Sequence, residues 1–190
     1  MAGKPIETPP LDRALANAAS PTRHLRIVAG DIRVSDDPNV VLTTILGSCV
    51  AACVRDPVAG VGGMNHFMLP TSDDGYWGAY QASLRFGNFA MERLIGDILA
   101  RGGRRDRLEI KLFGGANVLR NGSQVGWNNA AFVESFVAAQ GLAIEARHLY
   151  GELPRSVRYH PITGRAAMLE LRDPFALTVV ETEQAHLRLP

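Results

Sequence analysis

The chain has 190 residues, of which 46% are hydrophobic and 21% charged, and its formal net charge at pH 7 is +1. This composition is that of a globular protein, and the charge gives no basic footprint for binding nucleic acid. No apolar run approaches the roughly 20 residues that a membrane-spanning helix needs, and the N-terminus lacks the apolar stretch of a signal peptide. Two cysteines without a secretion signal favour a reducing cytoplasm, where a disulfide is not expected.

The length predicts one folded domain. Residues 1–23 are rich in Ala, Pro, Asn and Thr, so we expect a flexible N-terminal arm. The folded domain is expected over residues 24–172. Beyond it, residues 173–190 are expected to form a C-terminal tail.

Alternating and β-branched apolar runs predict strands, whereas apolar residues at helical spacing predict helices. In chain order we expect strands at about 25–29, 31–34 and 40–46, then two strands joined by a tight turn at Asp56-Pro57. A helix follows at about 80–101 and a strand at 108–113. A second helix at 128–139 has Asn128 as its expected N-cap and Gly141 just past its end. Strands at 142–149, 157–159 and 166–171 complete the chain, the last two as a hairpin.

The two strands around Asp56-Pro57 carry the residues with chemical potential. If residues 56–59 form the loop and Arg55 pairs with Gly60, Cys49 lies directly opposite His66 on the same face. A thiol beside an imidazole is what a cysteine nucleophile needs. A loop one residue longer would turn the two side chains to opposite faces, and a bulge at Gly62-Gly63 would also change the count.

Each of these residues also has an ordinary structural interpretation. Cysteine in an apolar strand is usually a core residue, and we interpret Cys53 in this way. A lone histidine near an apolar run is usually structural. Neither cysteine belongs to a metal-binding pattern, because no CxxC or HxxxH spacing occurs, so no metal or cofactor is expected.

The residues before Cys49 favour the catalytic interpretation. Gly47-Ser48 interrupts the strand pattern and allows the backbone to approach a substrate closely, so N–H groups around Ser48 and Cys49 could face an oxyanion. The hydroxyl of Thr43 or Thr44 could hold the imidazole in one tautomer. Ordinary strand propensity explains both threonines equally well.

The run LTTILGSCVAACVRDPVAGVGGMNHFMLP resembles the signature of the chemoreceptor glutamine deamidases, the CheD family. The matching features are Thr43 six residues before Cys49, the Gly-Ser-Cys step, His66 seventeen residues after Cys49, and Leu69-Pro70. Further matches lie at residues 111–116, at Val125-Gly126 with Asn129, and at Thr163-Gly164, so that the resemblance spans about residues 25–171. Gly114-Gly115 within this set is either a close-packing device or a backbone wall near the catalytic strands.

Two positions depart from the family pattern. Tyr150 replaces one glycine of a Gly-Gly pair, and Pro154 replaces the glycine before Arg155. Both departures lie in a region that we expect to bear on the substrate surface.

The resemblance implies an α+β fold with a layered β-sandwich core and helices on the outer faces. It implies a protein-glutamine deamidase in which Cys49, His66 and Thr43 are catalytic and Gly47 and Ser48 face the substrate oxyanion, with no cofactor. The implied partners are the cytoplasmic helices of chemoreceptors and a CheC-type phosphatase. Two alternatives remain: a thiol-dependent receptor methylesterase or amidase, and a non-catalytic module that regulates a CheC-type phosphatase.

Overall fold

The computed structural model describes residues 21–69, 77–118 and 124–172, together with residues 176, 178, 179 and 181. Most of the predicted arm, Pro70 of the family signature and most of the predicted tail lie outside the described residues. Residue 23, the expected end of the arm, is already the first residue of a strand. The four described tail residues are helical.

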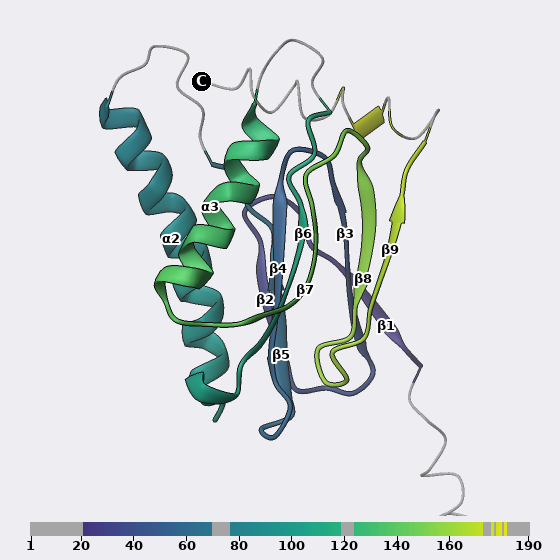
Figure 1. Cartoon of the computed structure of the whole chain (residues 1–190). Helices are drawn as coiled ribbons and strands as arrows, with labels where there is room; N and C mark the ends of the chain where they lie inside the picture. The colour runs from purple at the N-terminus through teal and green to yellow at the C-terminus, as the bar shows by residue number, and fades with distance from the viewer. Residues whose placement is uncertain are drawn as a thin grey trace, which may run out of the picture.

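In the described part of the chain, nine strands form two sheets that face each other (Figure 1). The four-stranded sheet has the order β1-β3-β8-β9 and consists of β1 (Arg23–Arg26), β3 (Val40–Leu46), β8 (Arg155–Tyr159) and β9 (Ala166–Glu170). The five-stranded sheet has the order β2-β5-β4-β6-β7 and consists of β2 (Ile32–Ser35), β5 (Val61–Asn65), β4 (Val50–Asp56), β6 (Glu109–Gly114) and β7 (Ile144–Leu149). The pairs β1–β3 and β6–β7 are parallel, and the other pairs are antiparallel.

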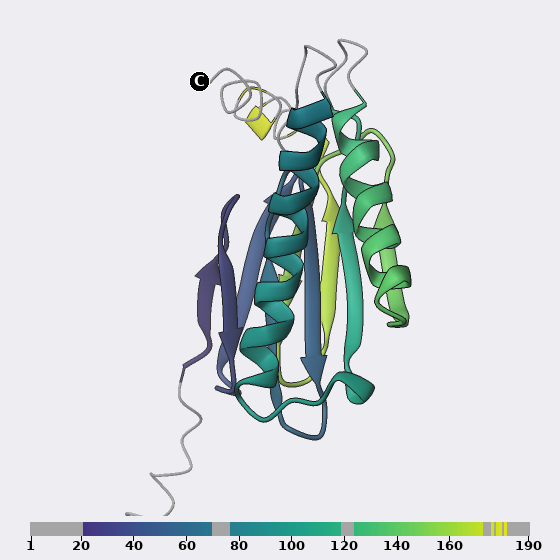
Figure 2. The same cartoon turned by 90° about the vertical axis from the view of Figure 1, so that its left-hand side faces the viewer.

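Two helices, α2 (Trp77–Leu99) and α3 (Val125–Ala139), lie side by side on the outer face of the five-stranded sheet (Figures 1 and 2). A 3-10 turn, η1 (Arg105–Arg107), follows α2. The predicted fold class, an α+β sandwich core with outer helices, is confirmed, and both described helices cover the same outer face. Neither of them is long and apolar enough to cross a membrane.

The two-layer core explains why β4 is apolar without alternation. Val50, Ala52 and Val54 pack towards the helices, whereas Ala51 and Cys53 pack between the two sheets. A strand buried on both faces reads as a continuous apolar run. Cys53 is fully buried, and burial strongly raises the pKa of its thiol, so its interpretation as a core residue is confirmed.

The C-terminal end of α3 agrees with the sequence prediction, but its N-terminal end does not. Gly141 has a φ of +65°, and the Leu142 N–H donates to the Val137 carbonyl at 3.1 Å, which confirms a glycine-dependent end of α3. The expected N-cap was wrong: α3 begins three residues before Asn128, with Gln124 at the N-cap position and no side-chain cap. Asn128 therefore lies exposed within the helix.

A buried carboxylate ties the β4–β5 loop to the chain after α2. Asp56 Oδ1 accepts the N–H groups of Val58 and Ala59 at 2.8 and 2.9 Å, and Oδ2 accepts the Arg104 N–H and Arg107 Nε at 2.8 and 2.9 Å. Burial by itself raises the pKa of this carboxyl, but the hydrogen bonds outweigh it and lower the pKa to about 2. Asp56 is therefore ionised in the folded protein at all ordinary pH values.

Asp56→Asn should destabilise the fold by about 2 kcal/mol, because it replaces the Oδ2 acceptor by an N–H₂ donor that faces Arg104 and Arg107. Urea unfolding at pH 7 measures this loss. Asp97→Asn, which removes an exposed i,i+4 pair with Arg93, is the control and should cost less than about 0.5 kcal/mol.

The difference between wild type and Asp56→Asn should depend on pH. Because the folded pKa lies below the unfolded value of about 3.9, the carboxylate stabilises fully above that value and loses its effect as the pH falls towards about 2. Equal stabilities of the two proteins at pH 7 would contradict this role of Asp56.

Candidate active site

The residues of interest lie where the chain crosses from one sheet to the other. β3 ends at Leu46 in the four-stranded sheet, and β4 begins at Val50 in the five-stranded sheet. Residues 47–49 form the bend between them. The Ala116 N–H donates to the Gly47 carbonyl at 2.9 Å, and the Gly115 N–H donates to the Cys49 carbonyl at 2.7 Å. Asn129 Nδ2 donates to the Ser48 carbonyl at 2.9 Å, so that all three carbonyls of the 47–49 bend are held.

Glycines make this close contact between backbones feasible. Gly114 has a φ of +110°, and a Cβ there would lie 2.1 Å from the Cys49 carbonyl oxygen. A Cβ on Gly126 would lie 2.2 Å from the Ala116 carbonyl oxygen. Of the two interpretations of Gly114-Gly115, the structure therefore favours a backbone wall against the 47–49 bend.

His66 follows β5 and faces the space between the sheets. Its N–H donates to the Asp31 carbonyl at 3.0 Å, and its carbonyl accepts the Gly30 N–H at 2.8 Å. Only 6% of His66 is exposed, compared with 4% of Cys49. These two bonds fix the backbone of His66 against the β1–β2 connection.

The predicted register of the β4–β5 hairpin was wrong by two residues. Arg55 pairs with Gly62 rather than Gly60, and Val50 pairs with Phe67. His66 is therefore a diagonal neighbour of Cys49 and not its direct partner. A shift by two residues keeps side chains on their face, and diagonal neighbours lie about 7–8 Å apart at Cα, within reach of a histidine ring.

The threonine beside the imidazole is Thr44, not Thr43. Thr44 Oγ1 lies 2.9 Å from His66 Nδ1, whereas Thr43 Oγ1 donates to the Leu25 carbonyl at 3.4 Å on the other face of β3. Burial alternates along β3, and the buried residues are Val40, Leu42, Thr44 and Leu46. The alternation of side chains along β3 thus places Thr44 on the inner face and Thr43 on the outer face. This corrects the choice of Thr43 as the threonine that orients His66, which followed from the family spacing.

The hydrogen bonds of Thr44 determine the tautomer of His66. Thr44 Oγ1 also lies 2.7 Å from the Ile27 carbonyl oxygen, which can only accept. The single hydroxyl proton of Thr44 is therefore donated to Ile27, and Oγ1 must accept from His66. It follows that Nδ1 of the neutral ring carries its proton and that Nε2 carries the lone pair.

Asn129 is a residue to which the sequence analysis gave no role. Its side chain is fully buried, and in addition to its bond to Ser48 it accepts the Leu69 N–H at 2.8 Å. One amide thus joins the chain next to Cys49 to the chain that follows His66. An asparagine between Val125 and Val133 on the buried face of α3 is the sequence signal that could have identified it.

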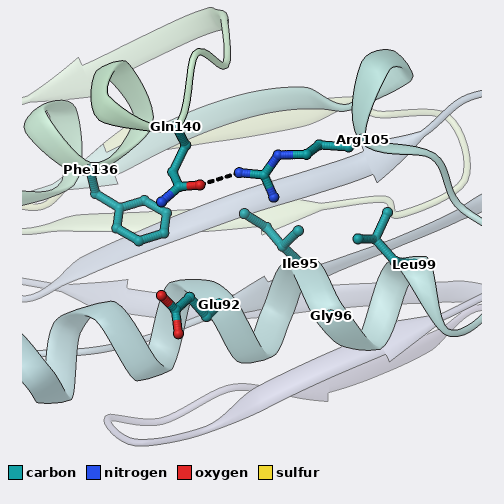
Figure 3. A pocket seen from close by; sticks show the side chains of 7 residues that line it. All are labelled: Glu92, Ile95, Gly96, Leu99, Arg105, Phe136 and Gln140. Atoms are coloured by element: carbon teal, nitrogen blue, oxygen red, sulfur yellow. Dashed lines mark hydrogen bonds between the residues drawn. The ribbon is translucent and has the colours of Figure 1, made fainter.

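The structure also has a hollow away from this site (Figure 3). It measures about 290 Å³ and lies between α2, α3 and η1, with an Arg105–Gln140 hydrogen bond at one end. It is lined by Glu92, Ile95, Gly96, Leu99, Arg105, Phe136 and Gln140. It contains no residue of the 47–49 bend and no nucleophile.

Comparison with known proteins identifies relatives over most of the chain. A family model described as "CheD chemotactic sensory transduction" matches residues 68–170, more than half of the sequence, beginning just after His66. A Rhodopseudomonas palustris protein named "Probable chemoreceptor glutamine deamidase CheD" is 54% identical over 160 residues, which cover 84% of this chain and 75% of that protein. An Acidiphilium cryptum protein of the same name is 48% identical over 91% of this chain and 93% of its own length.

Among solved structures, a Neisseria meningitidis protein has a TM-score of 0.42 and 10% identity, covering 74% of this chain and 66% of that one. This similarity is too low to bear on function. The family match and the relatives above do not depend on it. Because the family model matches more than half of the sequence and the relatives are about 50% identical over most of it, the chain belongs to the CheD family.

Proposed function

We propose that this protein is a cysteine-dependent protein-glutamine deamidase of bacterial chemotaxis. The observation that carries the proposal is the Ile27–Thr44–His66 chain, which leaves the lone pair of the imidazole on Nε2 in the layer that also holds Cys49. The names of the CheD relatives support chemoreceptor glutamines as substrates. The site residues are Cys49, His66 and Thr44, with Gly47 and Ser48 on the oxyanion side.

In this mechanism His66 Nε2 accepts the Cys49 proton, because a free thiol at pH 7 is only a few per cent thiolate. The thiolate attacks the side-chain amide carbon of a glutamine, and backbone N–H groups near Ser48 and Cys49 stabilise the oxyanion, each worth ~3 kcal/mol. The protonated His66 then gives its proton to the amide nitrogen, the C–N bond breaks, ammonia leaves and a thioester remains. A water molecule, deprotonated by His66, hydrolyses the thioester to glutamate and restores the thiol.

The held carbonyls of the 47–49 bend support the oxyanion role. Since the carbonyl oxygens of Gly47, Ser48 and Cys49 all accept bonds from the β6–α3 side, their peptide planes have fixed orientations. Catalysis by backbone dipoles depends on such preorganisation, because no reorientation is needed during the reaction.

The partners in this proposal are the cytoplasmic helices of chemoreceptors and, in organisms that have one, a CheC-type phosphatase. The activity is placed in the cytoplasm, where both cysteines stay reduced. Residues 24–172 form the catalytic domain, with the arm and the tail as additions to it.

Intact-mass analysis of a receptor cytoplasmic fragment tests the proposal. Deamidation adds about 1 Da per site and releases ammonia, whereas cleavage of a methyl ester removes about 14 Da and releases methanol. Cys49→Ala should fold and bind the fragment but release no ammonia, and Cys53→Ala should remain active. Full activity of Cys49→Ala would refute the mechanism. An unchanged fragment with the wild-type protein would favour the non-catalytic module.

Thr44→Val and Thr43→Val form a matched pair that separates the two threonines. Valine at position 44 removes the hydroxyl that orients His66, so kcat should fall by at least ~10-fold with little change in KM. Valine at position 43 should leave kcat within about twofold, because that hydroxyl bonds a strand carbonyl on the outer face. A larger loss at position 43 would overturn the assignment.

Asn129→Asp and Asn128→Asp make the same change at a buried and at an exposed position. Aspartate at position 129 retains the acceptor for Leu69 but loses the donor to Ser48, and we expect a roughly tenfold lower kcat. Asn128→Asp should have wild-type kinetics. Equal kinetics of the two variants would show that the Asn129 bridge does not align the site.

A further inference from the structure

Like Asn129, Arg155 is a buried polar side chain that is not a reacting group and lies near the 47–49 bend. Arg155 is the first residue of β8 and pairs with Leu46, which immediately precedes the 47–49 bend. It is 1% exposed, and among residues 21–69, 77–118 and 124–172 no carboxylate lies within ion-pair distance of it. Burying a guanidinium without an ion pair is costly, so its hydrogen bonds must offset the lost hydration.

All of those hydrogen bonds are made to residues at the end of β7 or in the connection from β7 to β8. One terminal nitrogen, Nη1, donates to the His148 carbonyl and lies 2.8 Å from His148 Nδ1. The other, Nη2, donates to the carbonyls of Tyr150 and Leu153. Because β7 and β8 belong to different sheets, the guanidinium joins the two sheets at the end where Cys49 lies.

The carbonyl of Tyr150 belongs to a residue in an unusual conformation. Tyr150 has a φ of +66°, and among the described residues it alone has a positive φ without being glycine. A side chain in this left-handed region costs about 1 kcal/mol, which explains why the family pattern has glycine there. Contacts offset this cost: the Tyr150 hydroxyl donates to Glu134 at 2.5 Å, and its ring packs edge-on against Trp127.

The loop that Arg155 holds is bonded to the backbone that holds the 47–49 bend. The Tyr150 N–H donates to the Gly114 carbonyl at 3.1 Å, and the Asn117 N–H donates to the Gly151 carbonyl at 2.8 Å. Between these two positions, the N–H groups of Gly115 and Ala116 bond to Cys49 and Gly47. Residues 114–117 therefore lie between the loop and the bend: the two outer residues, Gly114 and Asn117, bond to the loop, and the two inner ones bond to the bend.

We propose that Arg155 is a positioning residue for Cys49: by fixing the left-handed Tyr150, it holds residues 114–117 in the conformation that orients the 47–49 bend. Arg155 touches no reacting atom and acts through two layers of backbone. The kinetic part of this inference rests on the proposed deamidase function. The part that concerns the reactivity of the Cys49 thiol does not.

Arg155→Lys tests the inference in the full-length protein. Lysine keeps the charge but has no planar fork to reach the carbonyls of His148 and Tyr150 together. We expect a folded protein with at least a tenfold lower kcat on the receptor fragment and KM within about twofold. Alkylation of Cys49 by iodoacetamide, followed by peptide mass mapping, should slow by a similar factor. Arg158→Lys, three residues along β8 and exposed, is the control and should match wild type in both assays.

If Arg155→Lys fails to fold, a second pair of variants tests the role of the left-handed residue 150 without changing Arg155. Tyr150→Gly accepts the left-handed conformation and should retain kcat and alkylation rate within about threefold. Tyr150→Val, β-branched and unsuited to a positive φ, should lose about tenfold in both.

Equal rates for glycine and valine at position 150, or a folded Arg155→Lys with wild-type alkylation, would overturn the inference. Loss of kcat alone, with unchanged alkylation, would also overturn it. A wild-type protein without deamidase activity refutes the proposed function, and the alkylation comparison still tests Arg155.

Discussion

A threonine hydroxyl has one proton, and in this protein that proton is committed to the Ile27 carbonyl. The tautomer of the imidazole follows from this constraint, because Thr44 can then only accept from His66 Nδ1. A carbonyl from the end of β1 therefore determines which ring nitrogen is basic. The order of the four-stranded sheet, which places β1 beside β3, is thus part of the proposed chemistry and not only of the scaffold.

The 47–49 bend supplies the second half of the arrangement. The bend lies between the end of β3 and the start of β4, and buried backbone carbonyls need hydrogen-bond donors. Gly115, Ala116 and Asn129 provide them. These donors come from the end of β6 and the start of α3, elements that are more than 60 residues further along the chain. The family motifs that looked separate in the sequence are therefore two sides of one contact between backbones.

The sequence predicted the strands and both helices, because hydrophobic period and strand parity carry that information. It placed Cys49 and His66 on one face as direct partners, whereas the observed register makes them diagonal neighbours. It misplaced the hairpin register, since four-residue loops at 56–59 and at 57–60 fit the turn signals equally well, and moving the loop by one residue moves the register by two. It chose Thr43 over Thr44 because the family spacing selects Thr43, whereas the alternation of buried residues along β3 places Thr44 on the inner face. It assigned the start of α3 to Asn128, whereas the buried amide that matters is Asn129, one residue later.

The buried polar side chains of the site share one property that the apolar core lacks. Thr44, Asn65, Asn129 and Arg155 each join two or more elements: Asn65, for example, accepts the Ala52 N–H of β4 and donates to the Ala90 carbonyl of α2. An apolar contact survives small shifts of its partners, but a buried amide or guanidinium that loses its partner costs about 1–3 kcal/mol, and more for a charge. Small displacements of the backbone around Cys49 and His66 are therefore penalised. The hydrogen bonds that restrict the backbone there can be satisfied only by the native arrangement of both sheets and α3.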